Sequence, residues 1–189
     1  MSQRQDKLPE TLITTYLEMC DPLWFCPAYQ KDTQDLMMVR MGFPDLEYYR
    51  FLYRAVGEIW RWRDRLLLSD TELAAILASP CTTVTVLLIQ GVPAGYLELN
   101  QQDTEVEIAY FGLRPPYWGQ GLGKHLLSHG IAQAWQLGVK RIWVHTCNLD
   151  GPYALDNYLK RGFQVYRTEE QPMPQRYACS ETPKMFLTP

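Results

Sequence analysis

The 189-residue sequence lacks a strong charge of either sign, a long hydrophobic run and any paired cysteine motif. Its 18 basic and 21 acidic residues give a net charge of −3. A nucleic-acid-binding protein normally carries a basic stripe, so no nucleic-acid partner is expected. No apolar run approaches the roughly 20 residues that a membrane-spanning helix needs, so no membrane partner is expected either.

The cysteines and the N-terminal residues bear on the cellular compartment. The five cysteines are odd in number, irregularly spaced and without a CxxC pair, which argues against a disulfide framework and a zinc site. Free thiols fit a reducing cytosol. Residues 1–10 are polar and contain no apolar signal-peptide core. A cytoplasmic location is therefore expected.

The composition is that of an ordinary globular domain, with 47% hydrophobic and 21% charged residues. Residue patterns predict a mixed α/β fold with helices on both faces of a sheet. Residues 1–44 are expected to add an arm and extra strands to a core domain formed by residues 45–189. Strands are predicted over 11–19, 36–41, 82–90, 95–100, 105–113, 141–146 and 163–167, with a last strand at 176–178 or 184–187. Helices are predicted over 45–66, over 69–79, over 121–137 and over 152–161. Gly57 weakens the middle of the first one, and a split into two helices at this glycine is the alternative.

Three of these strands follow one another with only short turns between them, at 91–95 and 101–104. Such a run predicts an antiparallel meander. The third strand leads into alternating glycines, Gly119, Gly121 and Gly123, and a helix follows at once. Glycines let backbone N–H groups approach a ligand closely, and a helix N-terminus adds unpaired donors and a positive dipole end. The segment is therefore suited to bind a pyrophosphate.

Other phosphate-binding motifs fit this segment poorly. A nucleoside triphosphatase loop is disfavoured because Trp118 replaces its first glycine and His125 follows Lys124. The GxGxG spacing after a meander also differs from the GxGxxG of a parallel dinucleotide-binding unit. A glycine-rich turn that binds no ligand stays open as an alternative.

Two elements in this order resemble the GNAT N-acetyltransferases. The family's R/Q-x-x-G-x-G/A loop corresponds here to Gly121 and Gly123, and its downstream Ala, Tyr and Gly-Phe correspond to Ala154, Tyr158 and Gly162-Phe163. The combined match covers roughly residues 80–170 and is far more specific than either motif alone. The sequence is especially similar to bacterial members of unassigned substrate in the segments YYRFLYRAVG, AYFGL and HTCNLD. The resemblance implies the GNAT fold and acetyl-CoA as co-substrate. The residues it implies for coenzyme binding are Leu113, Trp118, Gly119, Gln120, Gly121, Leu122, Gly123, Lys124 and Asn148.

Two positions depart from the family pattern. Trp118 stands where Arg or Gln is usual, and Lys124 is a candidate to replace the lost polar contact. Gly151 stands where many members have Asn, and Asn148 or Asp150 is a candidate for that role.

The resemblance also implies catalytic roles. The backbone N–H of Leu113 would polarise the acetyl carbonyl, and Gly112 before it would support a bulge or a splay of the strand. Glu107 would be the general base, because it precedes Gly121 by fourteen residues, as in the histone-acetylating branch. Tyr158 would be the general acid. The alternatives are a solvent-facing strand glutamate at 107 and a packing tyrosine at 158.

Aromatic residues crowd into residues 43–62, the region that closes over the acceptor in this family. An acceptor pocket lined by Tyr53, Trp60 and Trp62 would suit an apolar or aromatic amine, and simple packing of the rings against the sheet is the alternative. His125 and His129 lie one helical turn apart without a third ligand, so no metal site is expected. His145, on a strand, is a candidate for proton relay or for a structural role.

The function expected from these features is transfer of an acetyl group from acetyl-CoA to a primary amine by direct attack in a ternary complex. A small-molecule amine is the expected acceptor. Alternatives are a protein or peptide N-acetyltransferase and a non-catalytic acyl-CoA-binding sensor or interaction module. A homodimer is expected only by analogy with the family.

Overall fold

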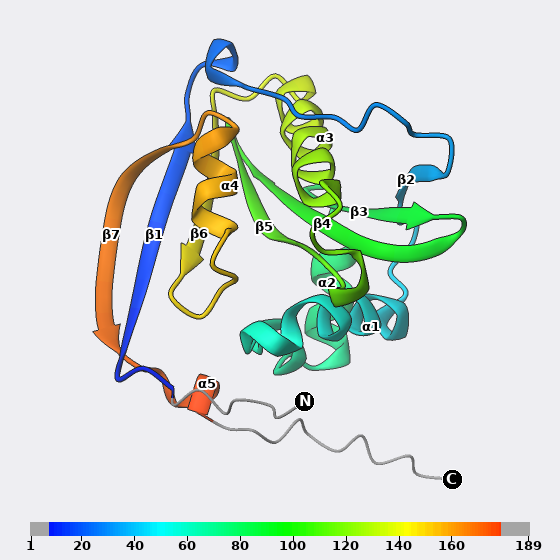
Figure 1. Ribbon diagram of the computed structural model, residues 1–189. Helices are drawn as coiled ribbons and strands as arrows, with labels where there is room; N and C mark the ends of the chain where they lie inside the picture. The colour runs from blue at the N-terminus through cyan, green and yellow to red at the C-terminus, as the bar shows by residue number, and fades with distance from the viewer. Residues whose placement is uncertain (1–7, 179–189) are drawn as a thin grey trace, which may run out of the picture.

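The computed structural model describes residues 8–178, which form one mixed seven-stranded sheet with helices on both faces (Figure 1). Its strands are β1 (Thr11–Met19), β2 (Leu36–Arg40), β3 (Thr82–Ile89), β4 (Val92–Gln102), β5 (Glu105–Leu113), β6 (Arg141–Cys147) and β7 (Gln164–Pro172). Its α-helices are α1 (Leu46–Gly57), α2 (Asp70–Ala78), α3 (Leu122–Gln136), α4 (Ala154–Lys160) and α5 (Gln175–Ala178). Within this range, no helix has both the length and the apolar character that a membrane crossing requires.

The strands lie in the order β2-β3-β4-β5-β6-β1-β7. Strands β3, β4 and β5 form the predicted antiparallel meander. The neighbours β5 and β6 are parallel and pair only from Glu105 to Glu107, after which they diverge. The N-terminal strand β1 lies between β6 and β7 and is antiparallel to both. Both strands of the first 44 residues, β1 and β2, thus belong to the central sheet.

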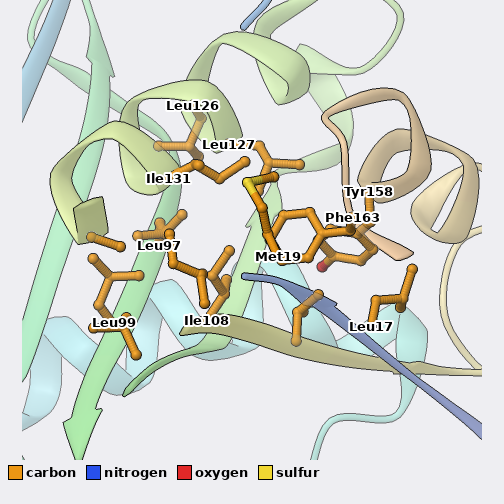
Figure 2. Packing of buried hydrophobic residues seen from close by; sticks show 14 of the residues in the cluster. Leu17, Met19, Leu97, Leu99, Ile108, Leu126, Leu127, Ile131, Tyr158 and Phe163 are labelled. Atoms are coloured by element: carbon orange, nitrogen blue, oxygen red, sulfur yellow. The ribbon is translucent and has the colours of Figure 1, made fainter. Parts of the chain in front are cut away.

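Each face of the sheet buries its own hydrophobic cluster. On one face, Leu126, Leu127 and Ile131 of α3 point toward Leu97 and Leu99 of β4, as Figure 2 shows. Helices α1 and α2 cover the opposite face (Figure 1). The alternation of side chains along each strand supplies both clusters, because successive residues point to opposite faces.

The first predicted helix is interrupted at Gly57, where a split was the alternative expectation, but no second α-helix follows in residues 58–66. It ends at Gly57, and 3₁₀ turns at Glu58–Trp60 and Asp64–Leu66 replace the rest of the predicted 45–66 helix. The Trp62 ring occupies the place where a Cβ at position 57 would lie, so only glycine fits there. Arg61 then reverses the chain with a φ of 60°. The second helix keeps its predicted capping box between Ser69 and Glu72.

Two further predictions about local structure are wrong. The turn expected over 91–95 consists only of Gln90 and Gly91, both with positive φ, and β4 begins directly at Val92. Two such residues form the tight hairpin turn that matches strand twist, so no longer loop is needed. The strand considered at 176–178 lies in the short helix α5, and the alternative at 184–187 lies outside the described residues.

Candidate functional site

The divergence of β5 from β6 leaves a cleft with a volume of about 940 Å³. One wall consists of β5 and the glycine-rich loop that follows it. The opposite wall consists of the end of β6, the loop after it and α4. The segment between α1 and α2 and the short helix α5 complete the lining. Of the residues predicted to act at the site, those that line the cleft are Trp60, Trp62, Glu107, Leu113, Trp118, Gly119, Gly121, Gly123, Lys124 and Tyr158.

The glycine-rich loop presents backbone donors at one part of this cleft. Gly119 and Gly121 both have a φ of 75°, a left-handed conformation that glycine adopts without strain. Gly121 is the N-cap of α3, and no side chain caps this helix. The first-turn N–H groups therefore remain available for an anion, and Lys124 adds a positive charge beside them.

A loop from the N-terminal region braces the glycine-rich loop. The Gln30 side-chain amide donates to the backbone carbonyl of Gln120 at 2.5 Å. The backbone N–H of Gln30 donates to Nδ1 of His125 at 3.0 Å. His125 is almost fully buried; burial and, to a lesser degree, the nearby His129 lower its pKa. The neutral ring keeps Nδ1 free to accept. Sequence reasoning missed Gln30, because nothing in the pattern of residues 22–35 indicates a contact with position 120.

Strand β5 directs two backbone N–H groups into the gap left by β6. Arg114 donates from its backbone N–H to Ala94 of β4 at 2.9 Å. Successive residues of an antiparallel pair alternate in hydrogen bonding, so the N–H groups of Leu113 and Phe111 point away from β4. The bulge of β5 lies at Ala109, where the register with β4 shifts, and not at Gly112, whereas Gly112 does lie in the part of β5 that is separated from β6.

Glu107 and His145 face each other where the two strands separate. His145 Nδ1 lies 3.5 Å from Glu107 Oε1. The Glu107 side chain is 15% exposed, whereas that of His145 is 45% exposed. Glu105, two residues earlier on β5, is instead paired with Arg141 at 2.9 Å and does not line the cleft. Glu107 therefore lies in a position where a carboxylate can take a proton from a bound amine.

Tyr158 enters the cleft from α4. Its ring makes edge contacts with Phe111 of β5 and Phe163 before β7. The residue is buried, and this burial, followed by the negative charge of Asp150, raises the pKa of its phenol well above the usual value. The hydroxyl therefore keeps its proton at neutral pH and can act as a hydrogen-bond donor.

Residues 57–66, called the strap below, run along the cleft between its two walls. Trp62 Nε1 donates to Asp150 Oδ1 at 3.2 Å, which ties the strap to the loop after β6. The other oxygen of Asp150 accepts from Thr146 Oγ1 and from the backbone N–H of Cys147. Asp150 therefore organises the wall opposite β5, whereas the sequence suggested it only as one candidate to replace the family's asparagine.

The remaining predicted residues lie outside the cleft lining. Leu122 is buried in the core, and Gln120 donates from its side chain to Pro116. Asn148 accepts from Ile13 N–H and donates to the carbonyl of Thr11, so it anchors β1 and does not line the coenzyme cleft.

Tyr53 also does not line the cleft, because it is fully buried behind Trp62 and Tyr110. The cleft lining does include Asn100, Arg65 and Tyr110, which the sequence did not single out. Across residues 8–178, no group of three or more His, Cys, Asp or Glu side chains is arranged to hold a metal ion.

Residues 46–163 match the sequence model of the acetyltransferase (GNAT) family. An aminoglycoside acetyltransferase from an uncultured soil metagenomic sample superposes with a TM-score of 0.57 at 20% identity, over 68% of this chain and 88% of that one. An acetyltransferase of the GNAT family from Novosphingobium aromaticivorans gives a TM-score of 0.60 at 17% identity, over 85% of this chain and 62% of that one. An IAA acetyltransferase from Bacillus cereus gives a TM-score of 0.54 at 22% identity, over 70% of this chain and 79% of that one. The search of curated proteins found no match.

Proposed function

The chain belongs to the GNAT acetyltransferase family, and we propose that it transfers an acetyl group from acetyl-CoA to a primary amine of a small molecule. The observation that carries this proposal is the gap between β5 and β6. In this gap, unpaired backbone donors and a carboxylate project from one strand into one cleft.

The residues of the glycine-rich loop fit the pyrophosphate of coenzyme A. The left-handed glycines, the uncapped start of α3 and Lys124 provide donors and positive charge for an anion. The acetyl thioester would supply the activated acyl group. The N–H groups of Leu113 and Phe111 face the same gap, where they would polarise the carbonyl oxygen as it gains negative charge.

The amine would attack directly while both substrates are bound. Glu107 would accept the proton that the amine loses, and His145 beside it would pass this proton toward solvent. Tyr158 would donate a hydrogen bond to the departing sulfur. Because the pKa of this phenol is raised by burial, its role is stabilisation of the thiolate more than complete proton transfer.

The lining of the cleft supports a small acceptor. Arg61 donates from its guanidinium to the carbonyl of Tyr177 at 3.2 Å, and Arg176 pairs with Asp64 at 3.0 Å. These contacts hold α5 against the strap at the cleft, which leaves less room for a folded protein. One structural neighbour is an aminoglycoside acetyltransferase, and aminoglycosides are small molecules.

An acetylation assay with a panel of primary amines tests this function. The Glu107→Gln variant removes the proposed base and should lower kcat by about 10²-fold or more. Glu105→Gln, on the same strand but outside the cleft, is the matched control and should keep wild-type turnover. Wild-type turnover by the Glu107→Gln variant would remove this residue from the mechanism. Failure of the wild-type protein to acetylate any amine of the panel would count against the enzyme.

A further inference from the structure

Three residues from separate segments meet across the cleft, and we call them the aromatic bridge: Trp60, Trp118 and Gly151. The rings of Trp60 and Trp118 are stacked, with centroids 5.5 Å apart and an interplanar angle of 30°. A Cβ at Gly151 would lie 3.2 Å from Cζ2 and 3.3 Å from Cη2 of Trp60, so one side of the six-membered ring of this indole lies close to the bare backbone of the glycine. Trp60 therefore connects the wall of the glycine-rich loop with the wall after β6.

The aromatic bridge accounts for both departures from the family's motif. Trp118 replaces the usual polar residue, and its indole N–H donates to the carbonyl of Leu113 at 2.8 Å, which fixes the ring beside β5. Gly151 replaces the usual asparagine, and any side chain at this position would press against Trp60. The two substitutions are thus coupled through one indole and form a single feature of the cleft.

Two contacts of the residues that follow Trp60 hold this part of the strap in place. Trp62, two residues later, is bonded to Asp150, the neighbour of Gly151. Arg65 Nη2 donates to the fully buried Glu98 at 2.6 Å. An aromatic ring fixed in this way offers a flat binding surface without a large loss of side-chain entropy on binding.

The charges that line the cleft indicate where the amino group of the acceptor binds. Four carboxylates line the described part of the cleft, and three of them are engaged: Asp64 with Arg176, Asp150 with Trp62 and Thr146, and Asp156 with Lys160. Among the described residues, the one ionisable partner recorded for Glu107 is the partly exposed His145. An ammonium group entering the cleft therefore finds its available counter-charge at Glu107.

We propose that the aromatic bridge makes this enzyme selective for planar aromatic primary amines, whose ring stacks in the cleft against Trp60 while the amino group lies at Glu107. The proposal rests on the proposed function, of which it specifies the acceptor class. A flat aromatic ring gains stacking energy on an indole that a saturated ring of the same carbon number does not gain. Peptides and aliphatic amines are then poor acceptors.

Calorimetric titration with 2-phenylethylamine and 2-cyclohexylethylamine tests this selectivity in the presence of coenzyme A. The two amines share the ammonium group and the carbon count, and they differ in the planarity of the ring. Wild-type protein should bind the phenyl compound about two- to tenfold more tightly. Trp60→Leu and Gly151→Ala should each bring the two affinities within about twofold, whereas Trp60→Phe should retain the preference. Ile59→Ala, at an exposed position of the strap, is the matched control and should behave as wild type.

The titration tests the ring selectivity independently of the acetyl-transfer activity. Equal affinities in wild-type protein, or a preference that persists in Trp60→Leu, would overturn the selectivity even if acetyl transfer is observed. Conversely, the titration measures binding and not turnover, so the ring preference can appear without acetyl transfer. In that case the aromatic bridge would stand as a binding determinant, and the proposed acetyltransferase function would fail.

Discussion

The buried ion pair between Glu98 and Arg65 should dominate the stability of the strap. Glu98 is fully buried on β4, where one carboxylate oxygen accepts from Arg65 Nη2 and the other from the hydroxyl of Tyr49. Burial lowers the pKa of Arg65, but the carboxylate of Glu98 together with Tyr110 and Tyr49 outweighs this effect, and the net pKa is raised. In Glu98→Gln, a neutral amide offers only one oxygen to two donors and leaves a partly buried cation without its counter-charge.

Breaking a buried ion pair on one side destabilises a protein by about 3–5 kcal/mol. The Arg65 side chain is 16% exposed and can partly reach water, so we expect the lower end, about 3 kcal/mol. For a chain of this length, this loss lowers Tm by about 6–12 °C. Because Arg65 lines the cleft, the KM for the acceptor should also rise.

Urea unfolding followed by circular dichroism measures the change in unfolding free energy. The control is Glu105→Gln, which breaks a pair with Arg141 in which the Glu105 side chain is 40% exposed. This variant should lose at most about 1 kcal/mol. A loss in Glu98→Gln no larger than in the control would show that the buried carboxylate does not hold the strap.

Three further predictions concern the glycine-rich loop, the leaving group and pH. Gly121→Ala should reduce the unfolding free energy by about 1–2 kcal/mol in a thermal melt, because Gly121 has a φ of 75° that alanine adopts only with strain. The same variant should weaken acetyl-CoA binding. Gly42→Ala is the control and should change neither the unfolding free energy nor the binding, because a Cβ at position 42 meets no atom within 4 Å. Tyr158→Phe should lower kcat at least about tenfold while the Kd of acetyl-CoA stays nearly constant, and unchanged kcat in single-turnover assays would contradict its role. Burial lowers the pKa of His125 in the folded state, so the unfolded chain binds more protons at acidic pH. The unfolding free energy should therefore fall as the pH decreases below about 6.5. Denaturation curves for His125→Gln should show a weaker pH dependence, and an unaltered dependence would exclude this histidine as the cause.

Local patterns were sufficient to predict most elements of the fold. The β-branched runs at β1 and β3, the capping box before α2 and the glycines before α3 each depend on neighbouring residues. The α/β class and the meander follow from these elements and from the short turns between β3, β4 and β5.

Contacts between distant segments could not be predicted in this way. Nothing in β1 shows that it pairs between β6 and β7, and this pairing is what engages Asn148. Similarly, the sequence indicated that Gly57 weakens the helix, but it did not reveal that the Trp62 ring packs on this glycine. The departures at Trp118 and Gly151 looked independent in the sequence, and only their shared contact with Trp60 explains them together.

The most direct test of the proposed function is calorimetric titration of the protein with acetyl-CoA and with S-acetylpantetheine, which lacks the nucleotide and its pyrophosphate. If the glycine-rich loop and Lys124 bind the pyrophosphate, acetyl-CoA should bind at least about tenfold more tightly than the truncated compound. Equal affinity for both compounds, or no binding of acetyl-CoA at high micromolar concentration, would contradict the assignment of this cleft to the coenzyme.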